Sequence, residues 1–325
     1  MFSMSETRNK TIGFKHHLAG LGKRIVDNWP IYVLLLPLLI HLVLFSYRPM
    51  TGLIIAFQRF SPFLGTAGSP FVGLENFEAL LFGHASMFFW RAVRNTVVIS
   101  AYGILFGFPF PILLGLMFNE IRLGKFRAIT QSILLLPNFL SEVIVVGIVI
   151  AFLQPSTGII NHFLVNIGIL ESGIYFMTRP EFFRGIFTFI GIWMGAGFAS
   201  LIYLAALTGI SPELYEAAML DGANRVQRIW HISIPGIMPT IITLFIVAIG
   251  GILGASFERA LLMLQPVTFS TGDIMGTYIY RIGFEQMPPN TSLSAAAGLM
   301  NAFVSLILVS TANFISRRVA KTGLW

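Results

Sequence analysis

The sequence contains no cysteine among its 325 residues, and only 11% of its residues are charged. The lack of cysteine excludes a disulfide framework, a thiolate metal site and a cysteine nucleophile. The scarcity of charge, together with 55% hydrophobic residues and a mean hydropathy of +0.80, excludes a surface that faces water on all sides. We therefore expect most of the chain to face lipid.

Three sequence patterns associated with catalysis are also missing. No Gly-x-x-x-x-Gly-Lys-Ser/Thr sequence occurs, so the chain lacks this phosphate-binding loop. The six histidines never form His-Glu-x-x-His, the zinc-binding pattern of metalloproteases, and no Ser/His constellation of a hydrolase can be assembled. We predict that this chain has no enzymatic activity, no metal site and no bound cofactor.

Hydrophobic runs define the fold class. A membrane-spanning helix needs about 20 largely apolar residues, and six windows qualify: 29–47, 94–117, 129–153, 184–208, 236–256 and 295–316. No small-residue cleavage site follows the first run, so we interpret it as a retained span and not as a signal peptide. The sequence therefore predicts an all-α, polytopic membrane protein with about six transmembrane helices.

The distribution of basic residues predicts the orientation in the membrane. Thirteen of the 21 lysines and arginines lie in the N-terminal segment, in 118–128, in 209–235 and at the C-terminus. Because cytoplasmic loops are enriched in basic residues, we expect both termini and 209–235 in the cytoplasm. The net charge of +7 then reflects orientation in lipid and not binding of nucleic acid. We therefore predict that the chain is divided into a cytoplasmic segment 1–28, a transmembrane domain 29–317 that includes the connection 209–235, and a cytoplasmic tail 318–325.

The connection 209–235 is too polar to span the membrane and carries helix signals. Ser211 and Pro212 form a typical helix start. Gly222 can take the left-handed conformation that ends this helix, and Asn224 can cap a second one. We predict two short helices that protrude at a fixed angle, the shape of a ligand for a groove in a partner. The alternative is an amphipathic helix that rests on the membrane surface.

A fixed spacing of small and acidic residues runs through the same connection. Glu216-Ala217-Ala218 is followed after three residues by Gly222, and nine residues later by Ile232-x-Ile234-Pro235. This pattern resembles the EAA loop of ABC importer permeases, with isoleucine at Ile234 where the family has leucine. Further segments resemble the carbohydrate-uptake branch of these permeases: YRPMTGLIIAFQRFSPF (47–63), VGLENF (72–77), FWRAVRNTVVIS (89–100), LLPNF (135–139) and TYIYRIGF (277–284).

The resemblance covers nearly the whole chain and implies a type I importer permease fold. Within the branch, the sequence is most similar to permeases for oligosaccharides from acidic polysaccharides, such as alginate or pectin fragments. It implies a transport subunit in a bacterial plasma (inner) membrane, working with a homologous second permease, an extracytoplasmic solute-binding protein and an ATPase subunit dimer that binds ATP and Mg. By resemblance, the ATPase-coupling residues are Glu216, Ala217, Ala218, Asp221, Gly222, Ile232 and Pro235.

Polar and aromatic residues inside the spans are candidates for a substrate path, because sugars are bound by hydrogen bonds and aromatic faces. These candidates are Asn138, Phe139, Ser141, Glu142 and Trp193. An ionisable group at membrane depth normally faces a cavity or a partner. Glu142 therefore either lines the path or is a structural carboxyl bonded to Asn138. Trp193 is either a sugar platform or a packing residue.

Seven arginines lie on or near the predicted outer side: Arg59, Arg91, Arg94, Arg179, Arg184, Arg259 and Arg281. We expect the outer loops to dock the binding protein, and Arg259 and Arg281 to attract an anionic sugar. The alternative is that each arginine is solvated or paired with Glu or Asp. A competing class is a secondary transporter driven by an ion gradient, which an intramembrane acid and broken helices would suit. The lack of inverted halves and the cytoplasmic loop weigh against that class.

Overall fold

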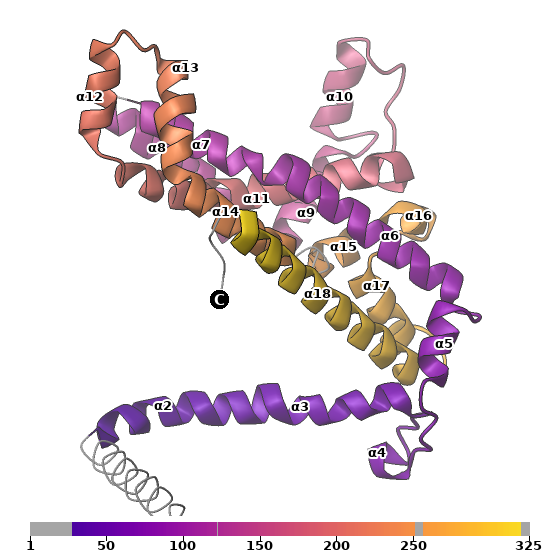
Figure 1. Ribbon diagram of the computed structural model, residues 1–325. Helices are drawn as coiled ribbons and strands as arrows, with labels where there is room; N and C mark the ends of the chain where they lie inside the picture. The colour runs from indigo at the N-terminus through magenta and orange to yellow at the C-terminus, as the bar shows by residue number, and fades with distance from the viewer. Residues whose placement is uncertain (1–27, 122, 251–255, 320–325) are drawn as a thin grey trace, which may run out of the picture.

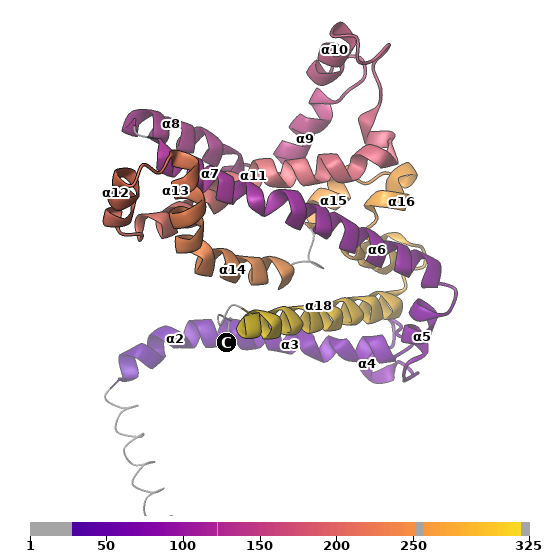
Figure 2. The same ribbon diagram turned by 45° about the horizontal axis from the view of Figure 1, so that its top comes forward.

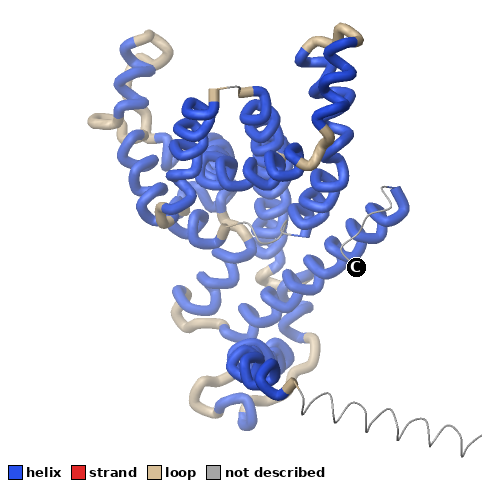
Figure 3. Tube along the Cα trace, turned by 90° about the vertical axis from the view of Figure 1, so that its left-hand side faces the viewer, coloured by secondary structure: helices blue, strands red, loops and turns tan. Residues whose placement is uncertain are grey.

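A computed structural model describes residues 28–121, 123–250 and 256–319 of the chain. Every named element in these ranges is helical. The β-type pairing in the described residues is an isolated antiparallel bridge between Gln58 and Phe71. Figure 3 shows helix and loop throughout the described part. The predicted all-α class is confirmed.

Seventeen α-helices follow one another along the described chain. They are α2 (Trp29–His41), α3 (Arg48–Met50), α4 (Gly65–Gly68), α5 (Glu75–Leu81), α6 (Ser86–Tyr102), α7 (Pro109–Glu120), α8 (Gly124–Leu135), α9 (Glu142–Phe152), α10 (Ile159–Asn166), α11 (Pro180–Thr208), α12 (Pro212–Leu220), α13 (Arg225–Arg228), α14 (Ile234–Gly250), α15 (Phe257–Met263), α16 (Phe269–Gly272), α17 (Met275–Tyr280) and α18 (Thr291–Val319). Short 3-10 and π turns join several of them into longer rods.

Five of these rods are long and apolar enough to cross a membrane: Trp29–Phe57, Ser86–Glu120, Pro180–Thr208, Arg225–Ile249 and Thr291–Thr311. A sixth candidate is the pair Gly124–Phe139 and Glu142–Phe152, a broken span in which the helix direction bends by 102°. In order along the chain they correspond to the six predicted windows. The first two rods extend well past the predicted bounds 29–47 and 94–117, and the end of window 236–256 lies outside the described residues.

The bend between α8 and α9 has a local cause. Pro137 lies in a 3-10 turn, Leu136–Phe139, and Leu140 is extended with ψ of 146°. Proline lacks the backbone N–H that would continue the helix. Ser141 then caps α9, because its hydroxyl accepts a hydrogen bond from the backbone N–H of Ile144. The predicted span 129–153 is therefore broken between α8 and α9.

The coupling connection and the outer connections lie at opposite ends of the molecule. In Figures 1 and 2, α12 and α13 lie beside α8 at one end, while α5, α16 and α17 lie at the other. The start of α2 lies toward the first end, and its rod runs outside the bundle and meets α18 near residues 51–57. No residue of the most apolar window of Trp29–Phe57 is buried. This chain therefore leaves the apolar surface of its first span uncovered.

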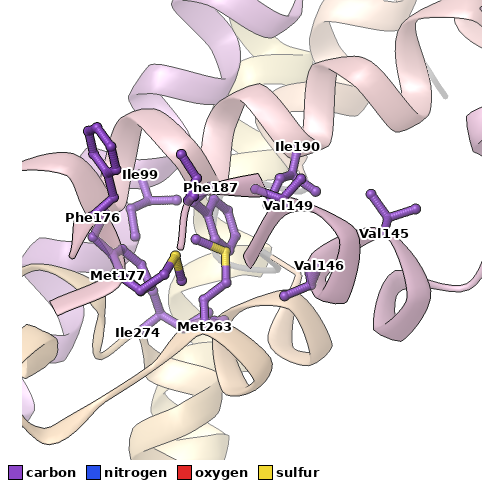
Figure 4. Close-up of a cluster of buried hydrophobic side chains, with 13 residues drawn as sticks. Ile99, Val145, Val146, Val149, Phe176, Met177, Phe187, Ile190, Met263 and Ile274 are labelled. Carbon is purple, nitrogen blue, oxygen red and sulfur yellow. The ribbon is translucent and has the colours of Figure 1, made fainter. Parts of the chain in front are cut away.

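The central helix α11 is held by two of the three apolar clusters. The cluster in Figure 4 joins α11 to α6, α9 and α15, and its most buried members include Ile99, Val145, Ile190 and Met263. A second cluster joins α11 to α7 and α14 near the coupling connection through Leu116, Tyr203, Leu207 and Ile237. The third cluster, at the outer end, packs α5 and α6 against α17 and α18. These contacts fix the helices that carry the candidate site.

Candidate coupling and translocation sites

The helix signals of the coupling connection are all present in the structure. Ser211 caps α12, since its hydroxyl accepts a hydrogen bond from the backbone N–H of Glu213 at 3.3 Å. Gly222 has φ of +79°, the left-handed conformation that ends helices. Asn224 and Gln227 form a capping box that starts α13, with reciprocal hydrogen bonds of 2.9 and 2.8 Å. Local sequence therefore determines this hairpin.

The second helix of the hairpin is continuous with the membrane span, which the sequence did not predict. α13 passes through a π turn, Ile229–Ser233, into α14 and forms one rod, Arg225–Ile249. Proline within a helix clashes with the carbonyl four residues earlier, and Pro235 is the second residue after this π turn. A π turn inserts an extra residue into the helical repeat, so the widened turn makes room for Pro235 without ending the helix. Of the two short helices predicted, α12 is therefore separate, whereas the second runs on into the span.

The residues predicted to couple to an ATPase lie on or beside one concave surface. Ala218, Asp221, Gly222 and Ile232 line a cavity of about 320 Å³ between the two arms of the hairpin. Glu216 and Ala217 are exposed on α12, and Pro235 is exposed where α14 begins. Large apolar side chains around the hairpin are also exposed, and these are Leu214, Met219, Leu220, Val226 and Trp230.

One side-chain hydrogen bond ties the two arms of the hairpin together. The hydroxyl of Tyr215 on α12 lies 3.0 Å from the hydroxyl of Ser233 in the π turn. Ser233 is buried, with 1% of its surface exposed. A force on α12 can therefore reach the rod of α14 through this contact as well as through the backbone.

Glu142, the ionisable residue predicted at membrane depth, pairs with Arg259. Glu142 Oε1 accepts a hydrogen bond from Arg259 Nη2 at 2.7 Å, and Oε2 accepts one from the hydroxyl of Ser256, also at 2.7 Å. The side chains of Glu142 and Arg259 are 20% and 12% exposed. The carboxylate therefore has these two partners in place of Asn138, the partner considered from the sequence.

The guanidinium of Arg259 lies in a site shaped by glycine. It stacks over Phe187, 5.1 Å from the ring centroid. A Cβ on Gly191 would lie 2.5 Å from Nη1, so only glycine leaves room for this position. Arg259 also lines a groove of about 290 Å³ with glycines from two rods: Gly103, Gly107, Gly191 and Gly195. The groove thus combines a cation with small side chains that leave the backbone accessible.

The other predicted path residues do not join this cluster. Asn138 and Phe139 are exposed in the 3-10 turn, and Ser141 serves as the cap of α9. Trp193 stacks on Phe189 with ring centroids 6.5 Å apart, and both line a different, apolar cavity of about 340 Å³. The structure therefore brings Glu142 to Arg259 but not to Trp193.

A second charged cluster lies at the outer end, around Asp273. This carboxylate is fully buried and accepts hydrogen bonds from Arg281 and from Thr277, while Arg91 lies 3.6 Å away. Burial raises the pKa of Asp273, and the charges of Arg281 and Arg91 lower it. Arg281, like Arg259, therefore already has a carboxylate partner. The part of the chain that the structure describes has no group of three or more His, Asp or Glu residues arranged for a metal ion.

The sequence singles out Glu142, Arg259 and Arg281, but it does not indicate that the first two pair with each other or that Ser256 and Asp273 complete the two clusters. Asp273 and Ser256 were not singled out, because Asp273 lies in an outer connection and Ser256 beside a predicted span end. One signal was available. An arginine and a carboxylate in apolar surroundings are costly alone, so each implies a partner of opposite charge elsewhere in the chain.

Comparisons with known proteins agree with this architecture. Residues 107–321 match the family model described as "Binding-protein-dependent transport system inner membrane component". The chain is 38% identical over 302 residues to the polygalacturonan/rhamnogalacturonan transport system permease protein YteP of Bacillus subtilis (strain 168), covering 93% of this chain and 92% of that one. It is 30% identical over 294 residues to the arabinooligosaccharides transport system permease protein AraP of Halalkalibacterium halodurans, covering 88% and 87%.

Solved structures give the same result. A crystal structure described as a bacterial ABC transporter involved in the import of the acidic polysaccharide alginate matches with a TM-score of 0.84 and 43% identity, over 92% of this chain and 99% of that one. A second structure of the alginate transporter, in complex with an alginate pentasaccharide-bound periplasmic protein, matches equally well over 93% of this chain. The chain belongs to the family of binding-protein-dependent transport system inner membrane components, in its branch of carbohydrate ABC permeases.

Proposed function

We propose that this chain is the permease of a bacterial importer for acidic oligosaccharides, powered by ATP hydrolysis on a separate ATPase subunit. The observation that carries the proposal is the hairpin of α12 and α13. It projects from one end of the molecule, exposes Glu216 and Ala217, and continues as one rod into the membrane. Such a hairpin can convert closure of an ATPase dimer into movement of α14.

Exposed apolar residues support an ATPase partner at the hairpin. Leu220 and Trp230 are 89% and 64% exposed, and they flank the cavity lined by Ala218 and Gly222. Large apolar side chains at a protruding helix are typical of helix-in-groove contacts. ATP and Mg²⁺ would be bound by that partner, in keeping with the absence of a phosphate-binding loop from this sequence.

A second permease would cover the uncovered surface of the first span. None of the most apolar window of Trp29–Phe57 is buried, and six helices are narrow for a path that admits an oligosaccharide. A homologous permease packed there would place the path between two subunits. Lipid would cover the remaining apolar surface.

An anionic substrate suits both the relatives and the charges of this chain. YteP is named for polygalacturonan and rhamnogalacturonan, and the matched structure is described as an importer of alginate. Those polymers carry carboxylates, which arginine binds with charge-assisted hydrogen bonds. An extracytoplasmic binding protein would deliver the oligosaccharide to the outer end of the permease, where α5, α16 and α17 lie.

The proposed orientation places both termini and the hairpin in the cytoplasm. Its basis remains the basic residues of the sequence, and the segments 1–27 and 320–325 lie outside the described residues. Because the natural chain has no cysteine, a single Val226→Cys variant can be labelled by a membrane-impermeant maleimide. Labelling in inverted vesicles but not in intact spheroplasts supports this orientation, whereas labelling from outside overturns it.

Transport driven by ATP is tested in proteoliposomes that contain the chain with its ATPase, second permease and binding protein. Uptake of an oligouronate should stop without ATP and survive a proton uncoupler, whereas a secondary transporter would give the reverse. Glu216→Lys should lower substrate-stimulated ATP hydrolysis while leaving much of the complex assembled. Glu171→Lys, a control at an exposed glutamate between α10 and α11, should change neither. Normal transport by Glu216→Lys would remove the coupling role.

A further inference from the structure

The structure divides the seven outer arginines into two groups. Five have a carboxylate partner: Arg59 pairs with Glu75, Arg91 and Arg281 with Asp273, Arg179 with Glu181, and Arg259 with Glu142. Within the described ranges, Arg94 and Arg184 form no ion pair with a carboxylate. They donate instead to neutral oxygens: Arg94 Nη2 lies 3.2 Å from the carbonyl of Ser270, and Arg184 Nη2 lies 3.1 Å from Oδ1 of Asn95.

Arg94 and Arg184 are both linked to the short helix α16, Arg94 directly and Arg184 through Asn95. Asn95 is fully buried, and its Nδ2 donates to the carbonyls of Phe269 and Asp273 at 3.3 and 3.2 Å. These bonds fix the amide so that its oxygen faces Arg184. Arg94 contacts the next residue of the same helix, Ser270, and its charge acts on Arg184. Both guanidinium groups are therefore held by neutral oxygens, at Ser270 and at Asn95.

The local charge is unbalanced. Arg91, Arg94, Arg184 and Arg281 lie around Asn95 and α16, and the ion pairs of these four arginines involve a single carboxylate, that of Asp273. Like charges at short range repel each other, more strongly where water is partly excluded. Arg184 is only half-exposed, and its Nε is buried without a hydrogen-bond partner. An anion bound here would relieve the repulsion, and a carboxylate matches the fork of donors that arginine presents.

Neither arginine lines the groove that contains Arg259, but Arg184 lies about one helical turn before Thr188, which does line it. On α11, positions 184, 188, 191 and 195 recur every three to four residues and therefore share one face, and the last three of these positions line the groove. On the neighbouring rod, Asn95 precedes Ile99 and Gly103 on one face in the same way, and both of those line the groove. The rise from Arg184 to Gly191, which touches Arg259, is about 10 Å along the helix. A chain with repeated carboxylates could therefore contact the outer pair before it reaches Arg259.

We propose that Arg94 and Arg184 form an anion site at the outer mouth of the groove, which binds a carboxylate of an acidic sugar chain as the chain enters. This inference rests on the proposed function and adds the position at which the acidic sugar first contacts the permease. It also corrects the expectation that Arg259 and Arg281 attract the substrate from outside, because their charges are already matched by Glu142 and Asp273.

The test compares a charged and an uncharged form of one oligosaccharide. Initial uptake of trigalacturonate and of its methyl ester is measured in phosphatidylcholine proteoliposomes with saturating binding protein, for the complete complex. The double variant Arg94→Gln/Arg184→Gln should lower uptake of the charged form about tenfold, as expected for loss of charge-assisted hydrogen bonds, and that of the ester less than twofold. Because each variant uses the same binding protein, the ratio of the two rates reports on the permease.

A matched control and a second variant guard against simple misfolding. The double variant Arg317→Gln/Arg318→Gln removes two exposed arginines near the end of α18, away from the outer connections, and it should leave both rates unchanged. Arg94→Lys/Arg184→Lys keeps the charges without the fork and should retain an intermediate rate for the charged form.

Three results would overturn the inference alone, and a fourth would overturn it together with the proposed function. An equal loss for both substrates would assign the pair a structural role. A loss that appears only when anionic lipid is added would assign it to a phospholipid headgroup. If the wild type prefers the charged form and the glutamine variant has the same ratio of charged to ester uptake, Arg94 and Arg184 are not an anion site, and the proposed function is unaffected. A wild type that imports neither form would remove both.

Discussion

Arg259 Nη2 and Glu142 Oε1 lie 2.7 Å apart although their residues are 117 positions apart in the sequence. Glu142 is the first residue of α9, immediately after the bend of the broken span, and Arg259 lies on α15 in the last outer connection. A carboxylate at a helix start is favoured by the helix dipole, which adds to the attraction of the arginine. The pair therefore fastens an outer connection to the bent part of the membrane domain.

Loss of the Glu142 charge should destabilise the protein. Glu142→Gln leaves Arg259 without its carboxylate, and breaking a buried pair in this way costs roughly 3–5 kcal/mol. The partial exposure of both side chains reduces the expected loss to about 2 kcal/mol. The apparent Tm of the purified complex should fall, and Glu142→Gln/Arg259→Met should recover part of it. A double variant no more stable than Glu142→Gln would contradict this account of the pair.

The same variant separates the two roles considered for Glu142. If the pair lines the path, Glu142→Gln should retain uptake but change the ratio of charged to neutral oligosaccharides, because Arg259 is then free to bind an anion. The ratio is measured with trigalacturonate and its methyl ester. Wild-type uptake of both, together with a lower apparent Tm, would show a purely structural carboxyl.

A methyl group at Gly191 should displace Arg259. The Cβ of Gly191→Ala would lie 2.5 Å from Arg259 Nη1, so the guanidinium must move away from its bond with Glu142. We expect a lower apparent Tm and slower uptake. Gly195→Ala is the matched control one turn later, where a Cβ meets nothing within 4 Å. It should be neutral or stabilising by up to about 1 kcal/mol, since alanine favours helix. Equal effects of both variants would argue against a specific role for Gly191.

Removal of the Tyr215 hydroxyl should weaken coupling more than folding. Tyr215→Phe loses the 3.0 Å contact with Ser233 that ties α12 to the π turn. We expect more ATP hydrolysed for each sugar imported, with basal ATP hydrolysis and assembly nearly unchanged. The exposed Tyr32→Phe in the first span is the control. An unchanged ratio of ATP to sugar in Tyr215→Phe would mean that the backbone alone transmits the motion.

Replacement of Arg281 should make stability depend on pH. Burial raises the pKa of Asp273, and Arg281 opposes that effect. In Arg281→Gln the folded-state pKa should rise further above its unfolded value. The contribution of Asp273 to stability is then present at low pH and is lost as the pH increases through the raised pKa. The apparent Tm of the variant, relative to wild type, should therefore fall as the pH rises from 4.5 to 8. Arg59→Gln, whose partner Glu75 is exposed, should show no such trend.

Local signals in the sequence predicted much of this molecule. Hydropathy located the spans, and the residues Ser211, Gly222 and Asn224 located the turns of the hairpin, because capping depends on neighbours in the chain. The continuity of α13 with α14 was missed, since Pro235 reads locally as a helix end. Tertiary packing and a π turn kept the backbone helical there.

Pairing between distant residues could not be predicted in the same way. The sequence marks Glu142, Arg259 and Arg281 as costly charges in apolar surroundings, but nothing local selects the partner of each. Trp193 is similar: its periodic position places it on a helix face, and only the packing of α11 against α9 decides that this face is apolar. The short helices of the outer connections, such as α10 and α15, were likewise not foreseen.

The continuous rod Arg225–Ile249 makes the hairpin one arm of a lever. Twenty-five helical residues extend about 37 Å, so a tilt of about 10° at the hairpin end would displace the far end by about 6 Å. The π turn at Ile229–Ser233 lies between the hairpin helix α13 and the span helix α14. Substitutions that make this π turn more flexible should let the hairpin move without moving the far end of α14, while the contacts between subunits stay intact.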